Sequence, residues 1–193
     1  MKLLLSFVLA MLIVPAIHGQ KTKEKSAGKM AFSSINQIGV LTGAAGESAT
    51  VQTINGVQIN KWFTGIGAGI NYYGMRSIPV FADVRKTFGN KPNSPFVYAD
   101  AGVNFPWETS NQLQQKGYEK SDIIGPFYDV GVGYKLSGKH NRAILISAGY
   151  SYKKMRNQSP MYSILPWPRP VTPNYETYTN HFRTIVVKVG VQL

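Results

Sequence analysis

The stretch "GIGAGINYY", from Gly65 to Tyr73, decides the fold of this chain. Its odd positions hold glycine and Asn71, and its even positions hold apolar side chains: Ile66, Ala68, Ile70 and Tyr72. Successive side chains of a β-strand point to opposite faces of a sheet, so this period predicts a strand with one apolar and one nearly empty face. A water-soluble sheet fills its inner face with large apolar groups. The surface that the isoleucines face therefore has to be identified.

The two-residue period continues from about Phe32 to the end of the chain, broken by turn residues, without a competing 3.6-residue period. We predict eight strands, over residues 32–43, 48–59, 62–73, 77–88, 95–106, 122–136, 142–155 and 178–193. The first two are the least regular, because "FSSINQIGVLTG" and "SATVQTINGVQI" alternate poorly.

In the last five strands one face is aliphatic and the other collects glycine, small polar groups and charges of both signs. The charged residues of that second face are Asp83, Arg85, Asp100, Asp129, Lys135, Lys153 and Lys188. A soluble barrel would hold its apolar face inside and its charges outside. We therefore predict the reverse: an all-β, eight-stranded antiparallel up-and-down transmembrane β-barrel with a polar interior and lipid-facing isoleucines.

The connections and the aromatic residues agree with that prediction. In an up-and-down chain the two long connections, 107–121 and 156–177, fall at one end, which is typical of the outer face of bacterial outer-membrane barrels. Trp62 and Tyr72 lie ten residues apart in one strand, which is about 25 Å along the membrane normal and matches the height of the apolar band. The predicted interface aromatics are Trp62, Tyr72, Phe105, Trp107, Tyr128, Tyr134 and Tyr150.

The first residues predict export. "MKLLLSFVLAMLIVPAIHGQ" combines one positive charge with a short apolar run, which is typical of a secretory signal peptide over residues 1–19, cleaved near Gly19. Residues 20–30 read as a flexible basic lead-in, and 31–193 as the barrel domain. The chain has no cysteine, so disulfides, thiolate metal sites and a lipoprotein anchor are excluded, and no cofactor is expected. Without Lys2 of the signal peptide, 20 lysines and arginines against 9 aspartates and glutamates give a net charge of +11, which favours anionic lipid over nucleic acid as a partner of an exported protein.

Three stretches resemble the small outer-membrane barrels common in the Bacteroidetes: "NGVQINKWFTGIGAGINYY", "IPVFADVRKTFG" and "SPFVYADAGVNF". The resemblance covers about residues 30–193 and implies an OmpA- or OmpX-like barrel in the outer membrane of a Gram-negative bacterium. Its motifs are specific for the barrel topology and indicate little about activity, because such barrels share a scaffold and not a reaction. Leu193 stands where such barrels usually end on an aromatic residue, and no peptidoglycan-binding domain follows the last predicted strand.

Two groups of residues are candidates for a function. The inward charges form either a gated polar pathway or an ion-paired plug, and the plug is the preferred interpretation because seven long groups fill a narrow lumen. A cationic rim would meet the phosphates of lipopolysaccharide by charge-assisted hydrogen bonds; its residues are Arg76, Lys154, Arg156, His181 and Arg183. Ordinary snorkelling cations are the alternative.

No enzyme motif is present: HExxH, GxSxG and a phosphate-binding glycine loop are all missing. The sequence therefore predicts a non-enzymatic protein with a structural or surface-interaction role, and the proline-rich loop 156–177 as a site for a protein partner or a lid. One alternative is an enzyme that modifies lipid A through His181, with Ser163 and Glu176 as possible partners. A narrow passive channel is the other.

Overall fold

The computed structural model describes residues 30–89, 91–108, 110–115, 120–138, 142–161 and 174–193. The predicted signal peptide and nearly all of the predicted lead-in lie outside these residues. Among the described residues no helix is long and apolar enough to span a membrane.

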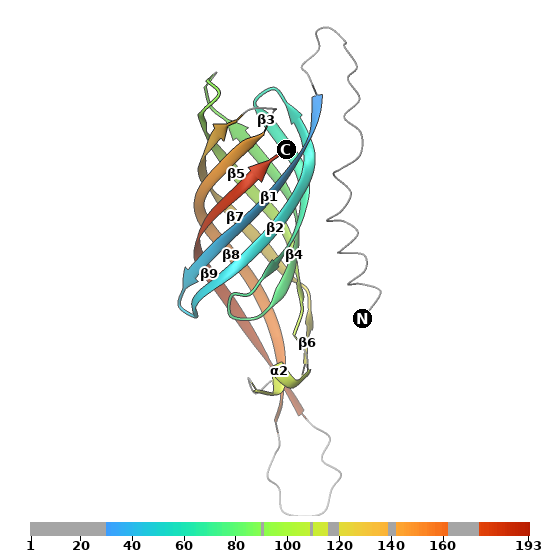
Figure 1. Ribbon diagram of the computed structural model, residues 1–193. Coiled ribbons are helices and arrows are strands. Elements are labelled where there is room, and N and C mark those ends of the chain that lie inside the picture. Colours follow the sequence, from blue (N-terminus) through green and yellow to red (C-terminus); the bar gives the residue numbers. More distant parts are fainter. Residues whose placement is uncertain (1–29, 90, 109, 116–119, 139–141, 162–173) are drawn as a thin grey trace, which may run out of the picture.

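Nine antiparallel strands form one sheet in the described part of the chain (Figure 1). They are β1 (Met30–Gly43), β2 (Gly46–Ile59), β3 (Trp62–Asn71), β4 (Ser77–Thr87), β5 (Ser94–Pro106), β6 (Lys120–Ile123), β7 (Gly125–Ser137), β8 (Ala143–Met161) and β9 (Asn174–Gln192). The short helix α2 (Ser110–Gln115) lies between β5 and β6.

Eight of these strands close into a barrel. Pairing runs in the order β8-β7-β5-β4-β3-β2-β1-β9, and β9 then pairs back with β8. Every neighbour is antiparallel and, apart from the closing pair β1–β9, each strand pairs with the next barrel strand along the chain. The predicted eight-stranded up-and-down barrel is confirmed. Closure removes the free edges that an open sheet would expose.

The two ends of the barrel differ. We call the end with the connections after β2, β4 and β7, together with Met30 and Leu193, the turn end. The other is the loop end, which carries α2, β6 and the tip of the β8–β9 hairpin and points downward in Figure 1. At the turn end Asn60 adopts a φ of 54°, and this left-handed conformation lets the chain reverse between Ile59 and Trp62.

At the loop end the predicted boundaries were wrong. Pairing between β8 and β9 continues without a break to Met161 and Asn174, so much of the predicted loop 156–177 is strand. The predicted strand 122–136 is interrupted at Ile124, which divides β6 from β7. The predicted loop 107–121 contains α2 and the first residues of β6. Beyond the apolar part of the barrel wall, strand residues are mostly polar on both faces. Because apolar and polar side chains do not alternate there, the two-residue period does not predict these parts of the strands.

The outer wall of the barrel is apolar. Aliphatic side chains that point outward are exposed, for example Val132 at 62%, Ile185 at 60% and Val187 at 50%. Their strand neighbours Asp129 and Lys188 point inward and are at most 2% exposed. Ile66 of the opening stretch is 71% exposed, so the isoleucines of that stretch lie on the outer wall. Such a wall is compatible with hydrocarbon and not with water.

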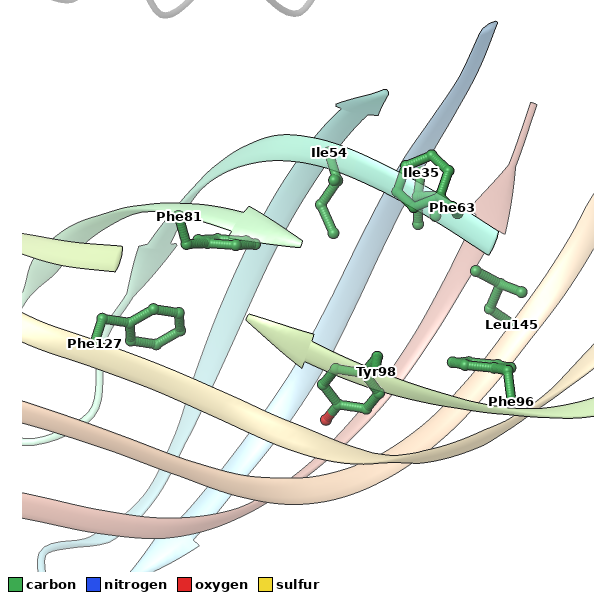
Figure 2. Packing of buried hydrophobic residues seen from close by; sticks show 8 residues of the cluster. All are labelled: Ile35, Ile54, Phe63, Phe81, Phe96, Tyr98, Phe127 and Leu145. Carbon is green, nitrogen blue, oxygen red and sulfur yellow. The ribbon is translucent and has the colours of Figure 1, made fainter. Parts of the chain in front are cut away.

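The interior is less polar than predicted, because large apolar side chains lie there beside the charges. Figure 2 shows a buried hydrophobic cluster inside the barrel. Its residues are Ile35, Ile54, Phe63, Phe81, Phe96, Tyr98, Phe127 and Leu145. A smaller cluster of Leu41, Tyr73 and Val186 packs with Phe182 nearer the loop end. Large apolar groups fill the lumen because an eight-stranded barrel has room for side chains and little else.

Glycines make room for one of these aromatic groups. Tyr98 lies across from Gly131, which in turn pairs with Gly149 of β8. A Cβ atom on Gly131 would lie 2.7 Å from Tyr98 Cε1 and would also meet the backbone oxygen of Ala148. A side chain at position 131 therefore cannot coexist with Tyr98 in its present position.

We predict that Gly131→Val lowers the free energy of unfolding by about 1–3 kcal/mol or more, because overpacking strains the core. Urea unfolding of the refolded barrel in detergent micelles, followed by circular dichroism, measures this change. Ala148→Val, on the outward face of the neighbouring strand, is the matched control and should change stability by less than 0.5 kcal/mol. Equal stability of both variants would contradict the close packing around Tyr98.

Candidate functional site

A row of three aspartates crosses the middle of the lumen. The register places Asp83 of β4 directly opposite Asp100 of β5, and Asp100 directly opposite Asp129 of β7. All three side chains are buried, with at most 2% exposure. Adjacent buried carboxylates repel one another unless cations lie between them.

Two cations lie within this row. Arg85 donates through Nε and Nη2 to both oxygens of Asp83, at 2.8–3.0 Å. Lys188 donates to Asp129 Oδ2 at 2.9 Å, and its Nζ lies 3.7 Å from Asp100 Oδ2. Bidentate arginine–carboxylate pairing fixes the geometry as well as the charge.

Tyr98 joins the two ion pairs. Its hydroxyl donates to Asp129 Oδ1 at 2.9 Å. The Lys188 ammonium lies 4.2 Å from the centre of its ring and the Arg85 guanidinium 5.6 Å from it. Arg85 Nη2 also reaches Gln37 Oε1 at 3.4 Å, and Gln37 Nε2 donates to Gln52 at 2.6 Å. We call the five charged residues with Tyr98 the ionic cluster: Asp83, Arg85, Asp100, Asp129, Lys188 and Tyr98.

The other two predicted interior charges lie outside this cluster. Lys153 is buried nearer the loop end and donates to Asn71 Oδ1, the Met75 carbonyl oxygen and Ser77 Oγ at 2.6–3.1 Å. These bonds hold the β3–β4 connection to β8. Lys135 is half-buried at the turn end.

Lys135 helps to line a small cavity with Arg85, Phe96 and Gln192. The cavity offers about 10 Å³ to the centre of a water-sized molecule, which is the room of roughly one water. The charged side chains that line it are Arg85 and Lys135.

On the outer wall at the loop end, β8 and β9 bring four of the five predicted rim residues together. Lys154 pairs with His181, Tyr152 pairs with Arg183, and Arg156 pairs with Thr179. The Tyr152 hydroxyl and His181 Nδ1 are 2.8 Å apart, and the Tyr152 ring stacks on Tyr128 at 6.2 Å. This surface joins cations to aromatic rings directly above the apolar wall.

Arg76 does not belong to that group. It precedes β4, and β5 and β7 separate β4 from β8. Its guanidinium lies 5.8 Å from the Trp107 ring, and its backbone N–H donates to Glu108 Oε1 at 3.3 Å. The predicted rim is therefore one cluster of four residues, Lys154, Arg156, His181 and Arg183, and one separate arginine.

The predicted catalytic alternative is not assembled among the described residues. His181 bonds to Tyr152, whereas Glu176 accepts a hydrogen bond from the Tyr178 hydroxyl at 2.7 Å. Ser163 lies outside the described residues. Within the described ranges no group of three or more histidine, aspartate or glutamate residues is arranged to hold a metal ion.

All seven predicted interface aromatics point outward, with exposures of 40–50%. Trp62 and Tyr134 lie towards the turn end. Those towards the loop end are Tyr72, Phe105, Trp107, Tyr128 and Tyr150. Trp62 also has the Lys86 ammonium 4.8 Å from its ring.

Sequence reasoning missed the uncharged partners of the ionic cluster. Gln37 and Gln52 lie on the two strands whose alternation is weakest, and the hydroxyl bond of Tyr98 depends on a register that no local pattern encodes. A glutamine on the inward face of each strand, Gln37 in β1 and Gln52 in β2, is the one signal that points to them.

No protein-family model matches the chain, and no curated protein matches it. Among solved structures the chain is similar to the neisserial surface protein A (NspA), with a TM-score of 0.46 and 14% sequence identity. The similarity covers 88% of this chain and 99% of that one. At this level of similarity no property of that protein is transferred to this chain.

We predict that Lys188→Met lowers the free energy of unfolding by about 3–5 kcal/mol, because it leaves two buried carboxylates with one cation fewer. The midpoint of urea unfolding in micelles measures the loss. Lys61→Met, at an exposed turn position, serves as control. The double variant Lys188→Met with Asp129→Asn should recover part of the loss. A cost below 1 kcal/mol for Lys188→Met would show that the ionic cluster is not coupled to stability.

Proposed function

We propose that this protein is an integral barrel of the outer membrane of a Gram-negative bacterium, with a non-enzymatic structural and surface-interaction role. The observation that carries the proposal is the inverted polarity of the barrel: paired charges lie inside, and exposed aliphatic side chains lie outside. An outer wall of this kind is stable only in hydrocarbon. The exported start predicted for residues 1–19 and the aromatic residues near both ends support the same placement.

The loop end then faces the outside of the cell and the turn end faces the periplasm, as in barrels with short periplasmic turns. The interior acts as a plug. Ion pairs and the hydrophobic cluster occupy the lumen, and the cavity beside Lys135 holds about 10 Å³. We therefore expect no steady ion conductance through the barrel.

The surface role rests on the β8–β9 hairpin. Both strands have 19 residues, the longest among the described strands. Pairing of β9 with β1 stops at Thr184, so within the described residues the segment 174–183 is paired only with β8. A long two-stranded hairpin above the membrane can contact an extended segment of a protein partner.

The lipid partner that we propose is lipopolysaccharide. Lys154, Arg156 and Arg183 lie immediately above the aromatic residues at the loop end, at the depth of lipid phosphates in the outer leaflet. Arginine and lysine bind phosphate through charge-assisted hydrogen bonds, and the neighbouring Tyr128–Tyr152 pair provides an aromatic surface beside them.

The membrane placement is tested by putting a charge on the outer wall. Val132→Arg should lower the free energy of unfolding in lipid vesicles by about 2–4 kcal/mol, because an arginine near the middle of the bilayer is costly. Thr179→Arg, which is exposed on the hairpin beyond the band, should stay within 0.5 kcal/mol of the native protein. A Val132→Arg variant as stable as Thr179→Arg would remove the membrane assignment.

The lipid contact is tested by neutralising the rim. The triple variant Lys154→Gln, Arg156→Gln, Arg183→Gln should retain several-fold less lipopolysaccharide through purification in mild detergent than the native protein, as measured by mass spectrometry. The triple variant Lys61→Gln, Lys86→Gln, Arg142→Gln removes the same charge at the turn end and should retain the native amount. Equal retention by both variants would assign the bound lipid to nonspecific charge.

A further inference from the structure

A group of asparagine and threonine side chains lies on the outer wall of β1, β2 and β3. Asn36 of β1, Thr53 and Asn55 of β2, and Thr64 of β3 point outward, and we call these four residues the polar patch. Asn55 and Thr64 are exposed, and Asn36 and Thr53 are half-exposed. Asn36 and Thr53 are direct neighbours in the register.

The patch lies within the apolar band and not at its margin. Asn55 pairs with Ile66 and Thr53 with Ala68, both of which lie between the aromatic residues Trp62 and Tyr72 of the same stretch. The corresponding outward positions of the other strands are apolar. They include Val80, Ala82, Val84, Val97, Ala99, Ala101, Val103, Val130, Val132, Ile146, Ala148, Val187, Val189 and Val191.

Hydrocarbon offers no hydrogen-bond partner, so an amide or hydroxyl that faces it loses its bonds to water without replacement. None of the side-chain hydrogen bonds found among the described residues involves the four residues of the patch. The four side chains cannot serve as partners of polar groups in the lumen either, since they point away from it. A partner inside the membrane must therefore supply donors and acceptors at this depth.

We propose that the polar patch is the contact surface between two copies of this chain in the membrane. Asparagine and threonine side chains both donate and accept hydrogen bonds, and the patch has no charge that would repel its own copy. A two-fold axis along the membrane normal places each residue at the same depth as its counterpart, so the same surface is complementary to itself. A lipid chain provides no such groups.

The shape of this wall agrees with a protein contact. Thr53, Ala68 and Thr64 are small and let a second wall approach closely, as small residues do between membrane segments. Ile66 and Ile38 stand at either side of the patch with exposures of 71% and 64%, among the highest of the outward aliphatic residues. They are suited to pack into the opposite wall.

Because the chain has no cysteine, single cysteine variants test the contact directly. Asn36→Cys, Thr53→Cys, Asn55→Cys and Thr64→Cys are expressed separately, and their native membranes are treated with a membrane-permeant oxidant. At least one should form a disulfide-linked species of twice the monomer mass, more than fivefold above the matched control Val132→Cys on the opposite wall. No cross-link above that control at any of the four positions would overturn the proposal, as would cross-links only to a species of another mass.

A second experiment needs no cysteine and therefore also applies if a cysteine substitution disturbs the contact. The quadruple variant Asn36→Leu, Thr53→Val, Asn55→Leu, Thr64→Val makes the patch apolar. Analytical ultracentrifugation in detergent should show the native protein as a dimer and the variant as a monomer with an intact barrel. A monomeric native protein, or a variant that dimerises as the native protein does, would contradict the proposal.

This inference rests on the proposed membrane placement, and its failure is distinguishable from the failure of that placement. If Val132→Arg destabilises the barrel and no patch cysteine cross-links, only the dimer contact is wrong. If Val132→Arg is tolerated, the membrane placement itself fails.

Discussion

The structure depends on one constraint: inward-pointing groups of an eight-stranded barrel have to be satisfied by other inward-pointing groups, because the lumen holds almost no solvent. At its centre the ionic cluster meets this constraint for Asp83 and Asp129, whereas both oxygens of Asp100 are buried without a hydrogen bond and Lys188 Nζ lies 3.7 Å from Asp100 Oδ2. Arg85 holds Asp83 through a bidentate pair, and Lys188 lies between Asp100 and Asp129. The rest of the lumen holds aromatic and aliphatic groups together with further buried polar groups, such as Lys153, whose ammonium donates to Asn71, Met75 and Ser77.

The ionic cluster and the hydrophobic cluster of the lumen depend on each other. Tyr98 belongs to both, since its ring packs in the hydrophobic cluster and its hydroxyl binds Asp129. Gly131 and Gly149 leave the space that this ring occupies. A small residue on one strand thus allows a large one on the next. The same holds between β3 and β4, where the Phe81 ring lies against the backbone at Gly67.

Much of the barrel could be predicted from the sequence because a lipid-facing wall imposes an apolar residue at every second position. That pattern is strong in β4, β5, β7, β8 and β9; β4, β5 and β7 were placed within three residues, whereas β8 extends six and β9 four residues beyond the prediction at the loop end. It weakens in β1 and β2 for a physical reason: Ile35 and Ile54 point into the lumen, whereas Asn36 and Asn55 point outward. In these two strands the apolar residues do not all lie on the outer face, so the pattern does not show which face of the strand is directed to lipid.

The candidate sites were predictable to a different degree. A two-residue period tells which face a charge lies on, so Asp83, Asp100 and Lys188 could be assigned to the interior from the sequence. It does not tell which inward groups meet, because that depends on the register between strands and around the whole barrel. Lys153 and Lys135 were grouped with the central charges for this reason, although each lies nearer one end of the lumen. The residues by which β8 and β9 extend beyond the predicted strands show no alternation of apolar and polar side chains, so the sequence did not predict this extension.

The distribution of the central charges along the chain has a consequence for how the barrel is completed. The three aspartates come from β4, β5 and β7, and of their two cations only Arg85 lies on the same part of the chain. Lys188 arrives with β9, the last strand to be synthesised. In a sheet that lacks β9, Asp100 and Asp129 are therefore without the cation that lies beside them in the closed barrel. The strand that closes the barrel is thus also the one that brings the second cation to its centre.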